Sequence, residues 1–325
     1  MSSQGVIAQQ TTPPSVTELP AVNVSDADTG PHVWEFSNGP VRVLMLGTID
    51  HARLSAGDPA PDVRNAIQQS GVVLGSPGVV IGEGIGILRG LSLWPSIRKS
   101  KYLPEGKQLA DVVPPDLYAS WRQIKSLYLG ENADVERMMP MYGAWKLHEA
   151  MLTKRGLRGG NQGRSLIAEL AQKHSIDMLD ARFHLVIKDP KRAVQQFQVP
   201  QQQDVECLRS TLASMQTSPL AFDELSDAWS RGDVAKMTAT LASNRFPDFC
   251  WVALTDQAIA RQQGVLLDSE MRDAWVAALR KGMATSNTIF MTAPVSDLLN
   301  QTGRIAWLTG EGFRPALTSP DEQPD

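Results

Sequence analysis

The sequence contains few of the residues that build common catalytic and metal centres. It has only two cysteines, Cys207 and Cys250, and five histidines among 325 residues. No Cys-x-x-Cys pair, His-Glu-x-x-His segment or Gly-x-Ser-x-Gly turn occurs in it. These absences exclude zinc-finger modules, thioredoxin-like redox centres, the common zinc-protease helix and the serine-hydrolase nucleophile turn.

Long apolar runs and an excess of positive charge are also missing. No apolar run approaches the roughly 20 residues that a membrane helix needs, and residues 1–12 lack the apolar core of a secretory signal. The formal net charge is −4, so the chain offers no basic surface to nucleic acid or anionic lipid. Apolar residues make up 42% of the chain, which is typical of a soluble globular protein with a core.

The two ends of the chain differ in composition from the rest. Residues 1–30 are polar and rich in Pro and Thr, and they contain too few large apolar groups to offset the entropy of ordering. We expect them to be disordered, as we expect for the tail 319–325, with a single domain over 31–318. The missing signal taken alone indicates a cytoplasmic protein, whereas the N-terminal composition is typical of an exported chain after cleavage.

The two cysteines allow two interpretations. Both Cys207 and Cys250 could be buried thiols, or they could form one disulfide between two helices if the protein is exported. Closing a loop of this length would stabilise the fold by roughly 3–4 kcal/mol in the chain-entropy model.

Strand patterns lie towards the two ends of the chain, with a helical block between them. Residues 32–49 predict a hairpin, because two β-rich runs flank a Ser-Asn-Gly-Pro turn. A short helix over 58–70 and a buried strand pattern over 71–82 suggest a parallel strand–helix–strand unit. The spacing is helical from about 86 to 283, and strands return at 287–294. The sequence therefore predicts an α/β fold whose central sheet is built from N- and C-terminal strands, with a large helical insertion.

The helical block divides into separate helices at glycine, proline and polar turns. A strand, or a strand and turn, interrupts it at 176–187, and a helix interrupted by a left-handed residue follows the last main strand at 295–313. Helices are expected at 86–100, 114–130, 140–156, 163–175, 189–197, 204–216, 220–233, 233–242, 246–264 and 269–283. Two glycine-rich segments, 82–90 and 159–165, lack the spacing of nucleotide-binding loops, so we interpret them as turns.

Five segments carry motifs in a recognisable order: VWEFSNGPVRVLMLGTID, SLIAELAQKHSIDMLDARFHLVI, LSDAWSRGDVAKM, DSEMRDAWVAAL and TIFMTAPVSDLLNQTGRIAWLTGEGF. Together, over residues 32 to about 318, they resemble the TraB/GumN family of α/β proteins, which includes the animal Tiki proteins. The resemblance implies a TraB/Tiki-like or EreA/ChaN-like sheet with the two strand-end motifs at neighbouring positions. It also implies a bacterial protein of the periplasm or a secreted one.

The same resemblance implies a divalent-metal site made by two Gly-x-x-His histidines and a glutamate, and some members of the family are metal-dependent proteases. In this sequence Asp50 and Asp297 stand at the histidine positions, and Gly75 stands at the glutamate position. Arg272 matches the family's arginine, with Asp273 in place of the usual asparagine. All three expected ligands are therefore changed.

The changed positions leave several alternatives open. Two carboxylates can hold a hard cation such as Mg²⁺, Ca²⁺ or Mn²⁺, and Zn²⁺ is a further candidate, but two alone usually bind weakly. His51 could replace a ligand only if the strand ends before it, because adjacent residues of an extended chain point to opposite faces. Glu83 could be brought round by a bend at Gly82. Asp50 and Asp297 could equally cap the elements that follow them.

Two functions follow from these alternatives. The first is a non-catalytic, extracytoplasmic binding or accessory protein with a degenerate metal site, no cofactor, and an unidentified protein or peptide as its partner. The alternative is a divalent-metal-dependent hydrolase, a peptidase, with Asp50 and Asp297 as metal ligands. In that case Arg272 would polarise a substrate carbonyl or hold a carboxylate.

Overall fold

A computed structural model describes residues 30–53, 60–81, 95–96, 98–159, 161–187, 189, 202–217, 220–244 and 264–316. Several features predicted from the sequence lie outside these described residues. They are the disorder of the two tails, the turn at 82–90 with Glu83, most of the helix at 86–100, the helices at 189–197 and 246–264, and Cys250.

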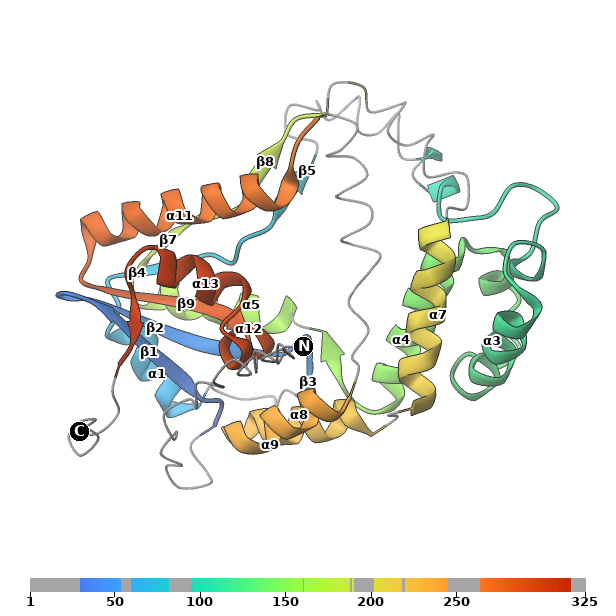
Figure 1. The fold of residues 1–325 in the computed structure, drawn as a ribbon, viewed down its shortest axis with the longest axis horizontal. Helices are drawn as coiled ribbons and strands as arrows, with labels where there is room; N and C mark the ends of the chain where they lie inside the picture. Colours follow the sequence, from blue (N-terminus) through green and yellow to red (C-terminus); the bar gives the residue numbers. More distant parts are fainter. Residues whose placement is uncertain are drawn as a thin grey trace, which may run out of the picture.

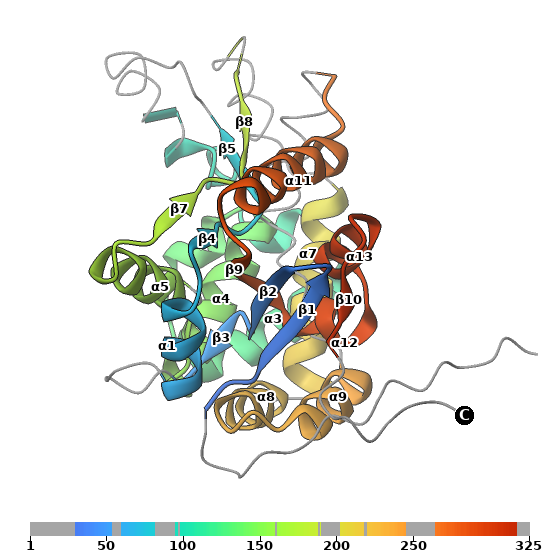
Figure 2. The same cartoon turned by 90° about the vertical axis from the view of Figure 1, so that its left-hand side faces the viewer.

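The centre of the fold is a six-stranded sheet with the order β10-β1-β2-β9-β4-β7 (Figures 1 and 2). Its strands are β1 (Val33–Asn38), β2 (Val41–Thr48), β4 (Val72–Leu74), β7 (Asp177–Leu179), β9 (Thr288–Pro294) and β10 (Arg314–Pro315). β2, β9, β4 and β7 are parallel, whereas β1 runs antiparallel to both β2 and β10. The sheet thus joins strands from both ends of the chain, and the predicted α/β fold is confirmed.

Two short ladders stand apart from the main sheet. β3 (His51–Ala52) pairs antiparallel with β6 (Arg158–Gly159), and β5 (Val79–Ile81) pairs parallel with β8 (Phe183–Leu185). The strand pattern expected over 71–82 is therefore two strands, β4 and β5. The one expected over 176–187 is likewise two, β7 and β8.

Both faces of the sheet are covered, which explains the unbroken apolar run of β2. Val43 and Met45 face one cluster, and Leu44 and Leu46 face another. The first face packs against α11 (Leu267–Thr285) and α13 (Gly303–Gly310), and the second packs against α1 (Pro61–Gln68) and α5 (Asn161–Lys173). The central strands are therefore buried between two helical layers.

A second group of helices lies beside the sheet and has a core of its own, centred on Trp121, Leu147 and Leu208. We call this group the helical unit. It comprises η1 (Leu109–Asp111), α3 (Pro115–Tyr128), η2 (Asp134–Arg137), α4 (Pro140–Lys154) and α7 (Gln202–Thr217). Part of the predicted helical block, α5 and α11, thus covers the sheet, and part forms this separate core.

Three further helices complete the fold next to the carboxyl ends of β2 and β9. They are α8 (Ala221–Ser230), α9 (Val234–Ser243) and α12 (Val295–Asn300). The interruption predicted within 295–313 is confirmed at Gln301, whose φ of 52° separates α12 from α13. α8 lies between the helical unit and the sheet in Figure 1.

Candidate functional site

The four parallel strands of the sheet end at one edge, which we call the carboxyl edge. β7 is followed by Asp180, β4 by Gly75, and β9 and β2 lead to Asp297 and Asp50. Ligands of open α/β sheets bind outside the carboxyl ends of the strands. The carboxyl edge is therefore the place at which a site would be expected from the topology alone.

The two strand ends predicted to meet are neighbours. β2 and β9 pair in parallel, and the last residues of the two strands, Thr48 and Pro294, stand opposite each other. Asp50 follows Thr48 by two residues, and Asp297 follows Pro294 by three. The main chain thus brings the two aspartates to the same part of the carboxyl edge, Asp50 in an exposed bend and Asp297 in the first turn of α12.

The carboxylate of Asp297 is engaged at the start of the next helix, α13. Its Oδ2 accepts a hydrogen bond from the backbone N–H of Arg304 at 3.1 Å. A Cβ placed on Gly303 would lie 2.4 Å from the same oxygen, and Gly303 has φ +50°. Asp297 therefore holds the α12–α13 turn closed, which is a capping role directed at α13 and not at its own helix.

The position of the implied glutamate is tightly packed. The N–H of Gly75 donates to the carbonyl of Leu179 at 2.9 Å, and a Cβ on Gly75 would approach that oxygen to 3.0 Å. Next to it, the hydroxyls of Ser76 and Thr292 share a hydrogen bond of 2.9 Å. This part of the edge presents hydroxyl and backbone groups in place of a carboxylate.

Asp180, the acidic residue after β7, is paired within its own loop. Its carboxylate accepts from the backbone N–H and the guanidinium of Arg182, and His184 Nε2 lies 3.4 Å from Oδ2. These bonds from Arg182 hold the pKa of Asp180 well below its usual range. Over the part of the chain that the structure describes, no three His, Cys, Asp or Glu side chains are arranged to hold a metal ion.

Arg272 lies on the exposed side of α11, in its second turn. Its guanidinium pairs with the carboxylate of the adjacent Asp273 at 3.1 Å, and both side chains are more than half exposed. Besides Arg182, a guanidinium at the carboxyl edge is that of Arg304, whose Nη1 donates to the carbonyl of Thr292 at 3.2 Å.

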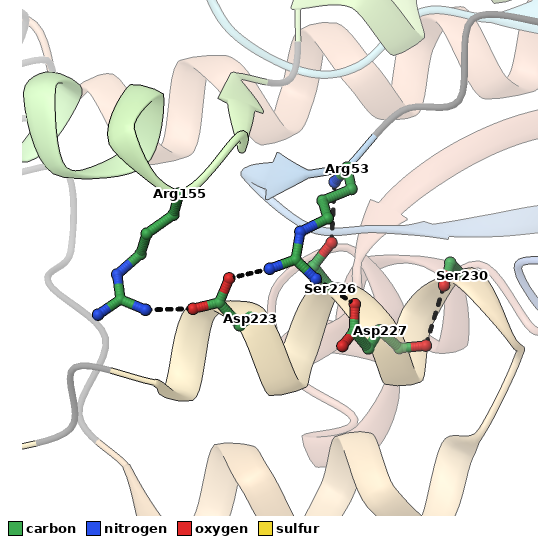
Figure 3. A network of polar contacts seen from close by, with 6 residues as sticks. All are labelled: Arg53, Arg155, Asp223, Ser226, Asp227 and Ser230. Carbon is green, nitrogen blue, oxygen red and sulfur yellow. Dashed lines mark hydrogen bonds and ion pairs between the residues drawn. The ribbon is translucent and has the colours of Figure 1, made fainter.

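The most extensive polar network of the site region lies where α8 meets the segment after β2 (Figure 3). Asp223 of α8 binds Arg53 through Oδ1 and Arg155 through Oδ2. Arg53 also donates to Asp227 at 2.8 Å, and its backbone N–H donates to the buried Ser226 hydroxyl at 2.8 Å. One turn of α8 thus binds the chain after β3 and the C-cap residue that follows α4.

Beside this network, three rings pack edge to face. His51 lies 5.1 Å from His148 and 6.4 Å from Phe222, and His148 lies 5.3 Å from Phe222. Burial lowers the pKa of His148 to about 4. Burial and the neighbouring His148 lower the pKa of His51 to about 3, so both imidazoles are neutral near pH 7. β2 does end before His51, but this ring packs into the junction between β3, α4 and α8.

The sequence model of the TraB/PrgY/gumN family matches residues 32–316. The chain belongs to that family. Neither a comparison with curated proteins nor one with solved structures gave a match. Asp50, Asp297 and Gly75 therefore lie within the segment that matches the family model.

The Trp-x-x-Gly-Asp segment that resembles this family joins α8 to the strand end. The indole N–H of Trp229 donates to the carbonyl of Gly47 at 2.7 Å. Gly232 adopts φ +68°, and a Cβ there would lie 2.7 Å from the carbonyl of Gly30, so this turn requires glycine. Asp233 then caps α9 by accepting from the N–H of Lys236. The segment is a structural brace at the end of β2.

Several residues of the site region were missed in the sequence. Asp223 and Asp227, one helical turn apart on α8, were an available signal for a cation-binding face. Arg304 carried no comparable signal, because its place at the edge depends on the turn between α12 and α13. Arg53 and Arg155 reach Asp223 only through the tertiary fold.

Of the two cysteines, for which buried thiols or one disulfide were the alternatives, the structure describes only Cys207. Cys207 is buried in α7 and is not a free thiol. Cys250 lies outside the described residues, so the pairing of the two cysteines stays a prediction. None of the described helices has the length and apolarity needed to cross a bilayer.

Proposed function

We propose that this TraB/PrgY/gumN protein is a non-catalytic binding or accessory protein with a degenerate metal site, and that it acts outside the cytoplasm. The observation that carries the proposal is the carboxylate of Asp297, which accepts from Arg304 N–H and packs on Gly303. A side chain held in this way serves the α12–α13 turn, which accounts for an aspartate at this position without a metal ion.

The other family positions support the same conclusion. Gly75 supplies no ligand, and its contact with Leu179 leaves little room for a longer side chain. Asp50 and Asp297 are then the two carboxylates at the three implied ligand positions, and Asp297 is engaged by Arg304 N–H. Hard divalent cations require six or more oxygen ligands, so one or two carboxylates without a further protein ligand give weak sites.

One observation favours the alternative, a divalent-metal-dependent peptidase. The pairing of Thr48 with Pro294 brings the segments of Asp50 and Asp297 together, as a shared cation would require. For this function Asp297 would have to bind the cation in addition to its hydrogen bond with Arg304 N–H, or give up that bond. We therefore rank it second.

The test is calorimetric titration of the full chain with Zn²⁺, Mn²⁺, Co²⁺, Mg²⁺ and Ca²⁺. We expect no stoichiometric site with a Kd tighter than about 0.1 mM. A micromolar site that disappears in both Asp50→Asn and Asp297→Asn would overturn the proposal. Asp297→Asn is the informative variant, because its amide oxygen can still accept from Arg304 N–H and so preserves the turn.

A peptide-cleavage assay in the presence of each metal is the second arm. The proposal predicts that wild type and Asp50→Asn release peptide fragments at the same background rate. Cleavage by wild type that both aspartate variants lose would establish the peptidase. Loss in one variant alone would show a single-carboxylate site, which also contradicts the non-catalytic proposal.

The extracytoplasmic location is proposed from the family resemblance, and the cysteines offer a test of it. Cys207 is not a free thiol, and disulfides persist mainly in oxidising compartments. Intact-mass measurement after alkylation in denaturant without reductant should show no modified cysteine, because unfolding exposes any buried thiol. Two alkylated cysteines in protein purified from its native compartment would contradict this location.

A further inference from the structure

The loop that carries Asp50 is attached to α8 on both sides. Before the loop, the carbonyl of Gly47 accepts from the indole of Trp229 at 2.7 Å. After it, the backbone N–H of Arg53 donates to Ser226 Oγ at 2.8 Å. Both anchors are on α8, so this helix helps to set the position of the loop, together with the pairing of Gly47 in the sheet and of His51–Ala52 with β6.

α8 is in turn attached to the helical unit. Asp223 gives its second carboxylate oxygen to Arg155, the C-cap residue that follows α4, and the side chains of Asp223 and Arg155 are only 16% and 19% exposed. The ring of Phe222 lies 5.3 Å from that of His148 on α4. The contacts of α8 with α4 are therefore largely shielded from solvent, where an ion pair is stronger than on the surface.

We propose that α8 transmits the position of the helical unit to the loop that carries Asp50, with Asp223 as the positioning residue. Its two oxygens bind one arginine from each side, Arg155 from the helical unit and Arg53 from the end of the loop (Figure 3). A displacement of α4 shifts α8, and α8 shifts both anchors of the loop. This coupling goes beyond the proposed function and holds whether or not the carboxyl edge binds a metal.

The loop that carries Asp50 is also connected to the helical unit by a β-ladder, and the experiment has to distinguish this route from the one through α8. β3 pairs directly with β6, which follows α4 in the chain, through His51 with Gly159 and Ala52 with Arg158. Transmission through this ladder would reach residues 51–52 first. Transmission through α8 reaches Gly47, which lies on the far side of the loop and is bound by Trp229.

The experiment is hydrogen exchange by mass spectrometry on the full chain, with Arg155→Gln as the main variant. Arg155 makes no hydrogen bond to the loop in the network, so a local effect would be confined to the C-terminal turn of α4, to β6 and to Tyr128 at the end of α3, which also bonds Arg155. We expect exchange to become about tenfold faster in 47–53 and in the first turn of α8, since a charge-assisted bond of this kind contributes roughly that factor. Arg155→Lys should restore part of the protection.

Asp227→Asn is the matched control, one turn further along α8. It removes a more exposed contact of Arg53 and leaves the bond between Asp223 and Arg155 in place. We expect it to leave exchange in α4 unchanged. Asp223→Asn should change hydrogen exchange as Arg155→Gln does and should in addition speed exchange at Arg53, its other partner. If this variant fails to fold, the two Arg155 variants still test the coupling.

The coupling would be overturned if Arg155→Gln changed exchange only in α4 and β6, or changed 51–52 while leaving 47–49 protected. Equal effects of Arg155→Gln and Asp227→Asn at residues 47–49 would also overturn it, because the control does not touch the helical unit. A uniform rise over the whole chain would show global destabilisation and would equally refute a specific connection.

Discussion

The carboxyl edge and the α8 junction use aspartate in opposite ways. At the edge, Asp297 binds the backbone of a residue seven positions away and stabilises a turn. At the junction, Asp223 binds Arg53 and Arg155, which are 170 and 68 positions away. A carboxylate at the edge therefore organises local structure, whereas the carboxylate at the junction joins the sheet, the helical unit and α8.

This difference shows that, among the contacts of the described residues, the carboxylate of Asp223 joins more distant parts of the chain than that of Asp297. The junction combines a shared carboxylate with the buried imidazole of His148, the partly buried imidazole of His51 and the ring of Phe222. Asp297 and Arg272, two residues to which the family resemblance assigns chemistry, have partners close to them in the sequence, whereas the network around Asp223 joins segments far apart in the sequence. The four predictions below test this contrast, beginning with the largest expected change.

Asp223→Ala should lower the free energy of unfolding by about 3 kcal/mol, because it removes the partner of a largely buried Arg155 and leaves that charge uncompensated. Urea denaturation at neutral pH measures the change. Asp227→Ala is the control: its carboxylate is 46% exposed, so its loss should cost below about 1 kcal/mol. Similar losses in both variants would show that Asp223 has no special role in joining the three segments.

The second prediction concerns the loss of stability at acidic pH. His148 has its pKa lowered by burial from 6.5 to about 4, so between these values the unfolded chain binds a proton that the folded chain does not. The free energy of unfolding therefore falls as pH drops below about 6.5. The loss should reach roughly 2 kcal/mol for this histidine at pH 5. Urea denaturation at pH 7.5, 6.5 and 5 measures it.

His148→Phe is the variant that isolates this effect, since it retains a ring facing His51 and Phe222. It should reduce the loss of stability between pH 7.5 and pH 5. Part of the pH dependence should remain because His51 is also partly buried with a lowered pKa. An unchanged slope in the variant would show that His148 does not titrate differently in the folded and unfolded chains.

The third prediction returns to the carboxyl edge. Asp297→Ala should cost about 1 kcal/mol, the usual loss when a helix-capping acceptor is removed, while Asp297→Asn should cost only a few tenths. Thermal and urea unfolding measure both. If Asn were as destabilising as Ala, the charge of Asp297 and not its hydrogen bond to Arg304 would matter, as expected of a cation ligand.

The regular part of the fold could be predicted because it depends on local signals. The apolar run of β2 and β9 identified buried strands, and the positions of Leu117, Trp121 and Ile124 identified α3 with Pro115 at its start. The meeting of the strand ends followed from the family resemblance and is confirmed by the register of Thr48 and Pro294 in the sheet.

The site region could be predicted only in part, for a physical reason. Asp50 and Asp297 were placed at the correct edge because the strands position their main chain. The direction of the Asp297 side chain depends on a left-handed Gln301 and on Gly303, whose missing Cβ makes room for the carboxylate. The junction around Asp223 depends on contacts over 68 and 170 positions, for which a single sequence contains no spacing signal.

The smallest expected effect is that of Arg272→Ala. Arg272 and Asp273 form an exposed pair on one helix, so the variant should change the free energy of unfolding by less than about 0.5 kcal/mol. Because the guanidinium pairs within α11, we also expect metal titrations and peptide assays of the variant to match those of wild type. If wild type showed a peptidase activity that Arg272→Ala lost at unchanged stability, Arg272 would instead be a substrate-binding residue. The residues implied by the family resemblance would then have a chemical role and not only a local structural one.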